Sequence, residues 1–251
     1  MSQSAWRDYE WCPRRYWHAH VDATPADRPV WAGWRFGRAV HSALEAALAA
    51  VQGTSQRPGD AVGLAAAREA LERARVVDGL DDDQAGEADD LVAGSLASLP
   101  LRGEQVLAVE ARLSADSPAG VRVVGRADLV VRWEDGSLGI CDHKVSRRPR
   151  SPDGLAVDRQ LALYGWMAGS RWPASEGITV SHHYPPLRRT VHAALTRDHI
   201  DRVVADLDAV AARIAADGVF RPQPGDHCRT CQWTATCPEG PSSDHDGWSA
   251  G

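Results

Sequence analysis

The sequence predicts an α/β fold in which a helical amino-terminal part precedes a β-meander and helices flank a central mixed sheet. Three observations lead to this prediction. Apolar residues recur at helical spacing before residue 100, three β-like runs then follow one another directly, and helical and β-like segments alternate afterwards. The length of 251 residues and the apolar content of 43% fit one globular domain of moderate size.

Each element follows from its own pattern. Helical spacing of apolar residues, with Gly and Asp breakers between the runs, predicts early helices over residues 37–51, 61–77 and 84–99. β-like runs bounded by turn residues predict meander strands over 106–114, 121–133 and 138–144. A Pro- and Arg-rich connection over 147–154 leads to a helix over 157–169. The order is completed by two short strands over 178–184 and 190–195 and a long helix over 197–216.

The chain is expected to form a single domain over residues 1–238, with a helical insertion at about 55–100 and a cysteine segment at 226–238. The tail over 239–251 is expected to be disordered. The amino terminus lacks the apolar core of a signal peptide, and no uninterrupted apolar stretch approaches the ~18 residues of a membrane span. We therefore expect a soluble, cytoplasmic protein.

The formal net charge of −6 does not by itself suit a protein that binds DNA. The acids, however, concentrate between Asp78 and Asp90, while basic residues cluster elsewhere. Candidate phosphate contacts are Arg14, Arg15, Arg35, Arg38, Lys144, Arg147, Arg148, Arg150, Arg188 and Arg189. Local charge matters more than total charge for binding a polyanion, although each cluster on its own could equally be a solvated surface.

The hairpin between the second and third predicted strands carries the most informative residues. A two-residue turn would send Asp128 and Asp142 to opposite faces of the sheet, because side chains alternate along a strand. A three-residue loop over 134–136, with Gly136 in the left-handed conformation, instead pairs residues whose numbers sum to 270. This register places Asp128 opposite Asp142, with Lys144 two residues further along the same face.

Two carboxylates and an ammonium group at one place suit the metal-dependent cleavage of a phosphodiester. Close carboxylates repel each other, and a divalent cation such as Mg²⁺ or Mn²⁺ relieves the repulsion. The cation also lowers the pKa of a bound water, while the lysine can orient or deprotonate that water or stabilise the transition state. An isolated Asp-x-Lys sequence is more often a solvated charge pair, so the rest of the chain has to support this interpretation.

Four of the five cysteines could share one metal centre. An odd number of cysteines without a secretion signal argues against a disulfide framework. Cys228, Cys231 and Cys237 lie within ten residues, and Cys12 is the natural fourth ligand because Cys141 is expected to point into the sheet core. Such a set suits an iron-sulfur cluster or Zn²⁺, and buried thiols without metal are the third alternative. In either ligated case the metal would join the two ends of the chain.

Helical positions supply further candidates. Gln160 and Tyr164 are four residues apart, which places them on one helical face within reach of the hairpin. His41 lies on the first long helix among apolar neighbours, where a histidine is more often a core or surface residue than a ligand. Half of the ten tryptophans lie near the amino terminus, where they could pack around the core or stack on bases. These are Trp6, Trp11, Trp17, Trp31 and Trp34.

Together these residues resemble the RecB-like branch of the PD-(D/E)xK nuclease superfamily, and within it the iron-sulfur exonucleases associated with CRISPR adaptation and bacterial recombination. The matching motifs in chain order are Cys12 to Tyr16, Gly37 to His41, Gly125 to Asp128, Ile140 to Lys144, Gln160 to Tyr164 and Cys228 to Cys237. Asp142 stands where many members have Glu, and Ala127 where Pro is usual. The resemblance spans nearly the whole chain and implies a restriction-endonuclease-like core whose termini are joined by a four-cysteine cluster.

The resemblance also implies roles for these residues. It implies that the metal is held by His41, Asp128, Asp142 and the backbone carbonyl of His143. The catalytic set would comprise Lys144 with Asp128 and Asp142, and Gln160 and Tyr164 positioning DNA or the lysine. A 4Fe-4S cluster would be bound by Cys12, Cys228, Cys231 and Cys237. Glu110, in the first strand of the meander, would be an accessory acid.

The expected function is thus that of a metal-dependent deoxyribonuclease using Mg²⁺ or Mn²⁺. It would be an exonuclease on DNA ends or single strands, in DNA repair or a related pathway, with a helicase or a CRISPR or repair protein as a partner. The alternative is a noncatalytic module that binds DNA or a partner protein and whose two ends are joined by the four-cysteine metal site. Zn²⁺ is the alternative to the cluster at that site.

Overall fold

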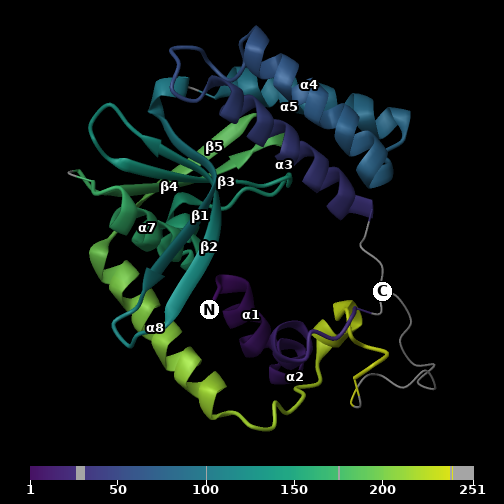
Figure 1. The fold of residues 1–251 in the computed structure, drawn as a ribbon, viewed down its shortest axis with the longest axis vertical. Coiled ribbons are helices and arrows are strands. Elements are labelled where there is room, and N and C mark those ends of the chain that lie inside the picture. The colour runs from purple at the N-terminus through teal and green to yellow at the C-terminus, as the bar shows by residue number, and fades with distance from the viewer. Residues whose placement is uncertain (27–31, 100, 175, 238, 240–251) are drawn as a thin grey trace.

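The computed structural model describes the chain apart from residues 27–31, 100, 175, 238 and 240–251. At its centre is a five-stranded mixed sheet in the order β1-β2-β3-β4-β5, with helices on both faces (Figure 1). The strands are β1 (Val106–Asp116), β2 (Arg122–Arg132), β3 (Leu138–His143), β4 (Ile178–Tyr184) and β5 (Arg189–Leu195). The predicted α/β class and mixed sheet are therefore confirmed, and each predicted strand is present.

The first three strands form the predicted antiparallel meander, whereas β3 and β4 run parallel. A parallel pair needs a crossover connection, and helix α7 (Arg159–Arg171) supplies most of it. Strand β5 then returns antiparallel to β4. The sheet thus consists of a meander and a hairpin that are joined edge to edge by one parallel pair.

Helices cover the two faces of the sheet. Helix α3 (Ala32–Val51) packs with α4 (Ala61–Ala74) and α5 (Asp82–Ser98) on one face. Helix α7 packs with α8 (Arg197–Ala216) and α1 (Gln3–Trp11) on the other. The shorter helical segments are α2 (Pro13–Tyr16), α6 (Pro152–Ala156), the π-helical turns Trp17–Val21 and Arg75–Gly79, and the 3-10 turns Gly103–Gln105, Pro185–Leu187 and Asp226–Thr230.

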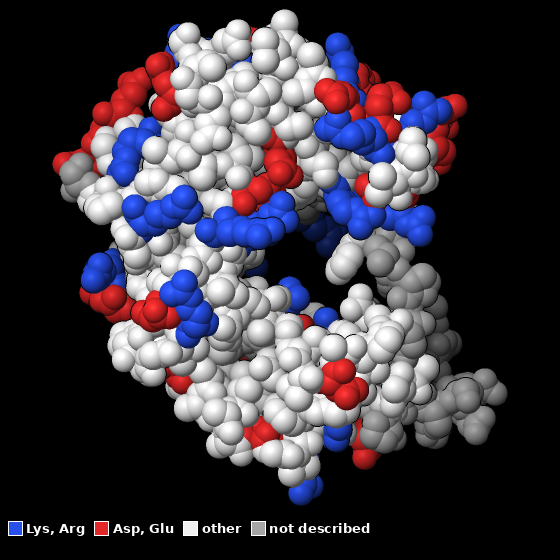
Figure 2. All heavy atoms as spheres, in the orientation of Figure 1, with Lys and Arg blue, Asp and Glu red and all other residues white. Residues whose placement is uncertain are grey.

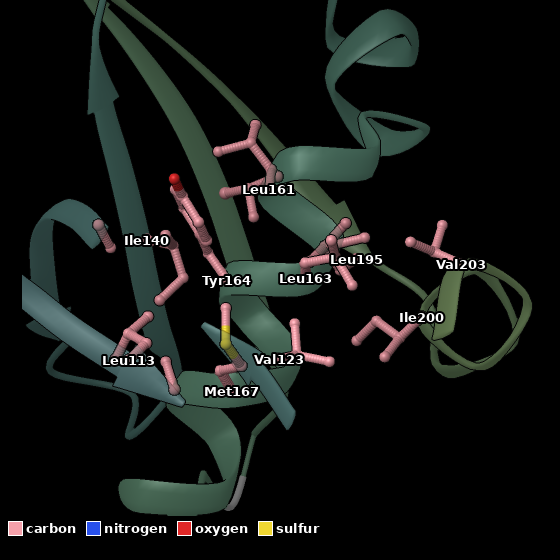
Figure 3. Close-up of a cluster of buried hydrophobic side chains, with 14 of the residues drawn as sticks. Leu113, Val123, Ile140, Leu161, Leu163, Tyr164, Met167, Leu195, Ile200 and Val203 are labelled. Atoms are coloured by element: carbon pink, nitrogen blue, oxygen red, sulfur yellow. The ribbon is translucent and has the colours of Figure 1, made fainter. Parts of the chain in front are cut away.

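Two apolar cores lie on opposite faces of the sheet. The first joins the strands to α7 and α8, and Figure 3 shows Leu113 and Ile140 in it beside Tyr164 of α7. The second joins the strands to α3, α4 and α5 through residues such as Leu44 and Leu129. Because both faces are covered, the strands that carry the predicted acids are held between two packed layers.

The amino-terminal segment and the β3–α7 connection contain helices that the sequence pattern did not indicate, since the first helix was expected at residue 37. Ser2 caps α1, because its hydroxyl accepts a hydrogen bond from the amide of Ala5. Within the predicted connection over 147–154, α6 begins at Pro152, a residue that suits the first helical position. Both helices are short, so their apolar spacing is too brief to show a helical period.

The single-domain prediction for residues 1–238, with its insertion at 55–100, stays a prediction. Helices α4 and α5 pack against α3, and Ser95 of α5 reaches His183 of β4 at 2.8 Å. Of the predicted tail, residues 240–251 lie outside the described residues. In the described part of the chain, no helix is both long and apolar enough to cross a bilayer.

Candidate active site

The β2–β3 hairpin has the register on which the site depends. Leu129 pairs with Cys141, so the numbers of paired residues sum to 270 as predicted. Gly136 has a φ of +87°, the left-handed conformation that the three-residue loop requires. The same register, continued by one residue, sets Asp128 across from Asp142.

Asp128 lies at the centre of the site. Its Oδ2 accepts a 2.7 Å hydrogen bond from the backbone N–H of His143 and lies 3.6 Å from His41 Nδ1. The pairing of β1 with β2 places Glu110 across from Asp128. Ligand atoms of His41, Glu110 and Asp128 all lie within 4.8 Å of one another. Two strands and helix α3 thus bring together two carboxylates and an imidazole, a donor set that suits Mg²⁺ or Mn²⁺.

Glu110 is held in an unusual backbone conformation. Its φ of +49° lies in the left-handed region, which residues other than glycine rarely adopt within a strand. Arg126 forms an ion pair with its carboxylate. Burial, and after it the charge of Asp128, raises the pKa of Glu110 to about 7. Only the family resemblance pointed to Glu110, because no local sequence pattern predicts a left-handed glutamate in a strand.

Asp142 and Lys144 form the second half of the site. Lys144 Nζ lies 2.6 Å from Asp142 Oδ2, and Asp142 is not part of the group of ligand atoms within 4.8 Å. Burial and then the charge of Asp128 raise the pKa of Asp142, although Lys144 and His182 oppose the shift. Burial lowers the pKa of Lys144, but the ion pair with Asp142 outweighs it, and the pKa is raised overall. Lys144 is therefore a cation at neutral pH, and it is the only lysine in the chain.

Helix α7 brings Gln160 and Tyr164 beside the hairpin, as their spacing predicts. Gln160 Nε2 donates a 3.0 Å hydrogen bond to the Tyr164 hydroxyl, whose oxygen lies at the edge of the apolar core (Figure 3). The Tyr164 ring packs so closely on Gly125 of β2 that a Cβ there would lie 2.6 Å from Tyr164 Cε1. Glycine at position 125 thus allows the approach of Tyr164 to the strand. Asp158 caps this helix by accepting a hydrogen bond from the amide of Leu161.

A buried histidine next to Asp142 was not predicted. The parallel register of β3 and β4 sets His182 beside Asp142, with Nε2 3.9 Å from Asp142 Oδ2. The other ring nitrogen, Nδ1, lies 3.1 Å from the hydroxyl of Tyr184, which also accepts a hydrogen bond from the Arg150 amide. The available signal was the polar run His182-His183-Tyr184 in a strand, but the pairing of β3 with β4 is a long-range feature that this run does not specify.

A second buried network supports the backbone of His143. The Nδ1 atoms of His143 and His183 lie 2.9 Å apart, and His183 Nε2 lies 2.8 Å from Ser95 Oγ. Burial lowers the pKa of both histidines to about 3, so both are neutral. These contacts are satisfied if His143 Nδ1–H donates to His183 and His183 Nε2–H donates to Ser95. The network connects helix α5 to the strand residue whose amide holds Asp128.

The structure also gathers the predicted cysteines from the two ends of the chain. One pocket is lined by Cys12, Cys228, Cys231 and Cys237. Cys12 Sγ accepts a 3.3 Å hydrogen bond from the backbone N–H of Gln223. Cys141 is buried in the sheet core, as expected, and burial raises its pKa to about 12. The fifth cysteine is thus separate from the pocket, and the four others line it together.

The fold and the site together define a class of protein. An antiparallel meander with one parallel crossover presents two aspartates and a lysine on neighbouring strands, which is the arrangement that the PD-(D/E)xK motif describes. The family model of the PD-(D/E)XK nuclease superfamily matches residues 1–238. The chain belongs to this superfamily, as its resemblance predicted, and is a nuclease.

Solved structures align with this chain, and one of them shares its fold. A protein from Eubacterium rectale, described as a candidate exonuclease, aligns with a TM-score of 0.56 and 12% identity over 92% of this chain and 86% of that chain. A protein named SSO0001 aligns with a TM-score of 0.40 and 15% identity over 83% of this chain and 96% of that chain. No curated protein matches the sequence. At 12% identity the likeness to the Eubacterium rectale protein concerns the fold alone, so the nuclease class rests on the superfamily match.

Proposed function

We propose that the protein is a metal-dependent DNA nuclease that hydrolyses phosphodiester bonds at DNA ends or in single strands, and that an iron-sulfur cluster joins its termini. One observation carries the nuclease assignment. Ligand atoms of His41, Glu110 and Asp128 lie within 4.8 Å of one another, beside the ion pair of Asp142 and Lys144. Carboxylates that can hold a divalent cation next to an ammonium group are the parts that such a hydrolysis needs.

The side chains fit a divalent cation. Burial first and the charge of Asp128 second raise the pKa of both Glu110 and Asp142, so these carboxylates are held closer than their own repulsion favours. A cation among them would remove that penalty. His41, Glu110 and Asp128 would hold it, with Asp142 and the carbonyl of His143 completing the set. When bound, the ion supplies a Lewis acid that lowers the pKa of a water and neutralises phosphate charge.

Lys144 is suited to act on the phosphate. Its raised pKa keeps the amine protonated at neutral pH, so it can stabilise the extra negative charge of the transition state more readily than it can accept a proton. Gln160 and Tyr164 come from helix α7 and are hydrogen-bonded to each other. We assign them to positioning the lysine or the DNA strand.

The shape and the charge of the molecule support a nucleic acid substrate. Figure 2 shows the molecule hollowed in its middle, with Lys and Arg side chains along the upper rim of the hollow. Exposed Arg147 and Arg148 follow shortly after Lys144 in the chain. Phosphate contacts from such arginines give binding that does not depend on base sequence. The net charge of −6 therefore does not oppose this substrate, because the positive charge is gathered locally.

The cysteine pocket favours a cluster over zinc. Four thiolates at ~2.3 Å from a tetrahedral Zn²⁺ would lie about 3.8 Å from one another. In the part of the chain that the structure describes, no three of the thiols have sulfur atoms within 4.8 Å of one another. A cluster places irons and sulfides between its ligands and so spaces the ligands more widely. We therefore assign a 4Fe-4S cluster, and anaerobically purified protein should show broad absorption near ~400 nm.

The test of the active site is cleavage of labelled single-stranded DNA with Mn²⁺ by the wild type and by Asp142→Asn. The amide keeps the size of the side chain but removes the charge, and we expect cleavage to fall by at least ~10²-fold. The matched control is Asp153→Asn, which changes an exposed acid at the start of α6 and should cut like the wild type. Equal cutting by Asp142→Asn would contradict the assigned site. A wild type that binds DNA and cuts nothing would favour the noncatalytic binding module.

A further inference from the structure

We propose that a pocket between α1, the start of α3 and the cysteine segment binds an unpaired nucleobase of the DNA strand, a few nucleotides from the bond that is cut. This inference rests on the proposed nuclease function. The pocket has a volume of about 360 Å³. The side chains that matter in it are Trp11, Trp34, Arg7, Arg15 and Gln232.

The two tryptophans are unusually exposed. Trp11 is 44% exposed and Trp34 is 67% exposed, whereas Trp6 of the same region is 2% exposed and belongs to the core. Tryptophan buries most of its surface in folded proteins, so two open indoles in one pocket mark a binding surface. Within the described residues, Trp34 has no aromatic or cationic partner. Its ring is therefore available to stack on a base.

The charges around the pocket suit a phosphate. The guanidinium groups of Arg7 and Arg15 lie 5.7 Å and 5.1 Å from the centroid of the Trp11 ring. Asp8 lies 2.9 Å from Arg15 and 3.9 Å from Arg7, and it also contacts His20 at 2.9 Å. One carboxylate thus faces two arginines, so the rim of the pocket carries a net positive charge. The side chain of Arg7 is 47% exposed and can therefore contact a ligand. Indole faces next to arginine are the chemistry that recognises a single-stranded nucleotide.

Helix α3 connects this pocket to the candidate metal site. Trp34 and His41 are seven residues apart on it, nearly two full turns, so they lie on the same side of the helix and about 10 Å apart along its axis. A stacked strand advances ~3.4 Å per nucleotide, so this separation corresponds to roughly three nucleotides. Figure 1 shows the start of α3 on the same side of the molecule as the carboxy-terminal cysteine segment. Gln232 of that segment forms part of the pocket wall.

The experiment is equilibrium binding of short single-stranded DNA to the Asp142→Asn protein without divalent cations, which separates binding from cleavage. Two strands of equal length are compared, one an oligothymidylate and the other with abasic residues in place of the thymidines. Because both carry the same phosphates, the ratio of their dissociation constants reports the bases alone. Stacking of a base predicts that the strand with bases binds about 5- to 150-fold more tightly.

Variants locate the effect. In the Trp34→Ala protein the ratio of the two dissociation constants should fall close to one. The Trp34→Phe protein should retain part of the preference for the strand with bases. Trp172→Ala is the matched control, because Trp172 stacks on Arg171 at 4.4 Å at the end of α7, outside the pocket, and its loss should leave the preference unchanged. A preference that survives Trp34→Ala, or equal binding of the two strands, would overturn the pocket. Mn²⁺-dependent cleavage by the wild type would still stand in that case, so the two failures are distinguishable.

Discussion

The carboxylate site and the cysteine pocket are assembled in opposite ways. Asp128 and His143 are 15 residues apart and are joined by a direct hydrogen bond across one hairpin. Cys12 and Gln223 are 211 residues apart and meet only because the chain returns to its beginning. The first site is fixed by the register of a buried sheet, while the second depends on the docking of two terminal segments.

For the two proposed metal sites, this difference predicts two kinds of metal dependence. The sheet holds Glu110 and Asp128 together against their repulsion, so removal of the divalent cation should stop the reaction and leave the fold intact. The four cysteines come from two terminal segments that meet at the pocket, so the metal centre that we propose there would contribute free energy of folding to the termini. The following changes separate the two sites.

The largest effect is expected at Lys144. Lys144→Ala removes the cation that we propose stabilises the phosphate in the transition state, and we expect the rate of DNA cleavage to fall by about 10²- to 10³-fold. Lys144→Arg keeps the charge but changes its geometry, so it should recover only part of the rate. The measurement is single-turnover cleavage of labelled DNA with Mn²⁺. Absorption near ~400 nm should stay unchanged in both variants, because the lysine does not contribute to the cysteine pocket.

The next effect concerns the cysteine pocket. Cys12→Ser removes the thiol that the amino terminus contributes to the pocket. A changed supporting residue already lowers metal affinity by ~10- to 100-fold, and we expect loss of this proposed ligand to lower it at least as much. We expect lower visible absorption and a lower midpoint of thermal unfolding, measured anaerobically. Cys141→Ala is the control, since Cys141 lies in the sheet core and its loss should leave the visible absorption unchanged. Full absorption in Cys12→Ser would remove Cys12 from the ligand set.

Local signals were sufficient to predict the hairpin. Gly136 predicted its own left-handed conformation, and the loop length then set the register that brings Asp128 and Asp142 together. Helix α8 likewise has the predicted bounds, because its apolar residues keep a helical period over twenty residues. Elements with a long period or a specific turn residue can therefore be predicted from sequence alone.

Long-range features could not be predicted in this way. His182 lies beside Asp142 only because β3 and β4 pair in parallel, and a local pattern does not specify which strands pair. No local pattern indicates the left-handed conformation of Glu110, and the short helix α1 has too few apolar residues to show a period. The cysteine grouping was reached through spacing and a family resemblance, since 211 residues separate the partners Cys12 and Gln223.

Glycine substitutions test how tightly the carboxylate side is packed. A Cβ at Gly125 would lie 2.6 Å from Tyr164 Cε1 and 2.8 Å from Met167 Cε, so Gly125→Ala should destabilise the fold by about 1–3 kcal/mol and displace Tyr164. Gly86→Ala is the matched control, because no atom of the described residues lies within 4 Å of a Cβ placed there, and α5 should gain ~0.5–1 kcal/mol of stability. Urea denaturation measures both changes. Equal stability of the two variants would show that Tyr164 does not need this close approach.

The smallest expected effect is acid sensitivity, and it belongs to the carboxylate side. Burial lowers the pKa of His143 and His183 to about 3, whereas unfolded histidine titrates near ~6.5. Below about pH 6.5 the histidines of the unfolded chain bind protons, whereas those of the folded protein stay neutral. The part of the folding stability that comes from this difference is therefore fully present above that pH and is lost as the pH falls. Each of the two histidines should lower the free energy of unfolding by roughly 0.8 kcal/mol when the pH falls from about 7.5 to about 6.

The measurement for this effect is urea denaturation of metal-free protein at the two pH values. Ser95→Ala separates the network from a general effect of acid. It removes the group that His183 Nε2 contacts at 2.8 Å but leaves both rings buried, so it should lower stability at both pH values without changing the pH dependence. If wild-type stability did not fall between these pH values, the two rings would already be protonated or open to water in the folded state. The buried support that we assign to the backbone of His143, and through it to Asp128, would then be absent.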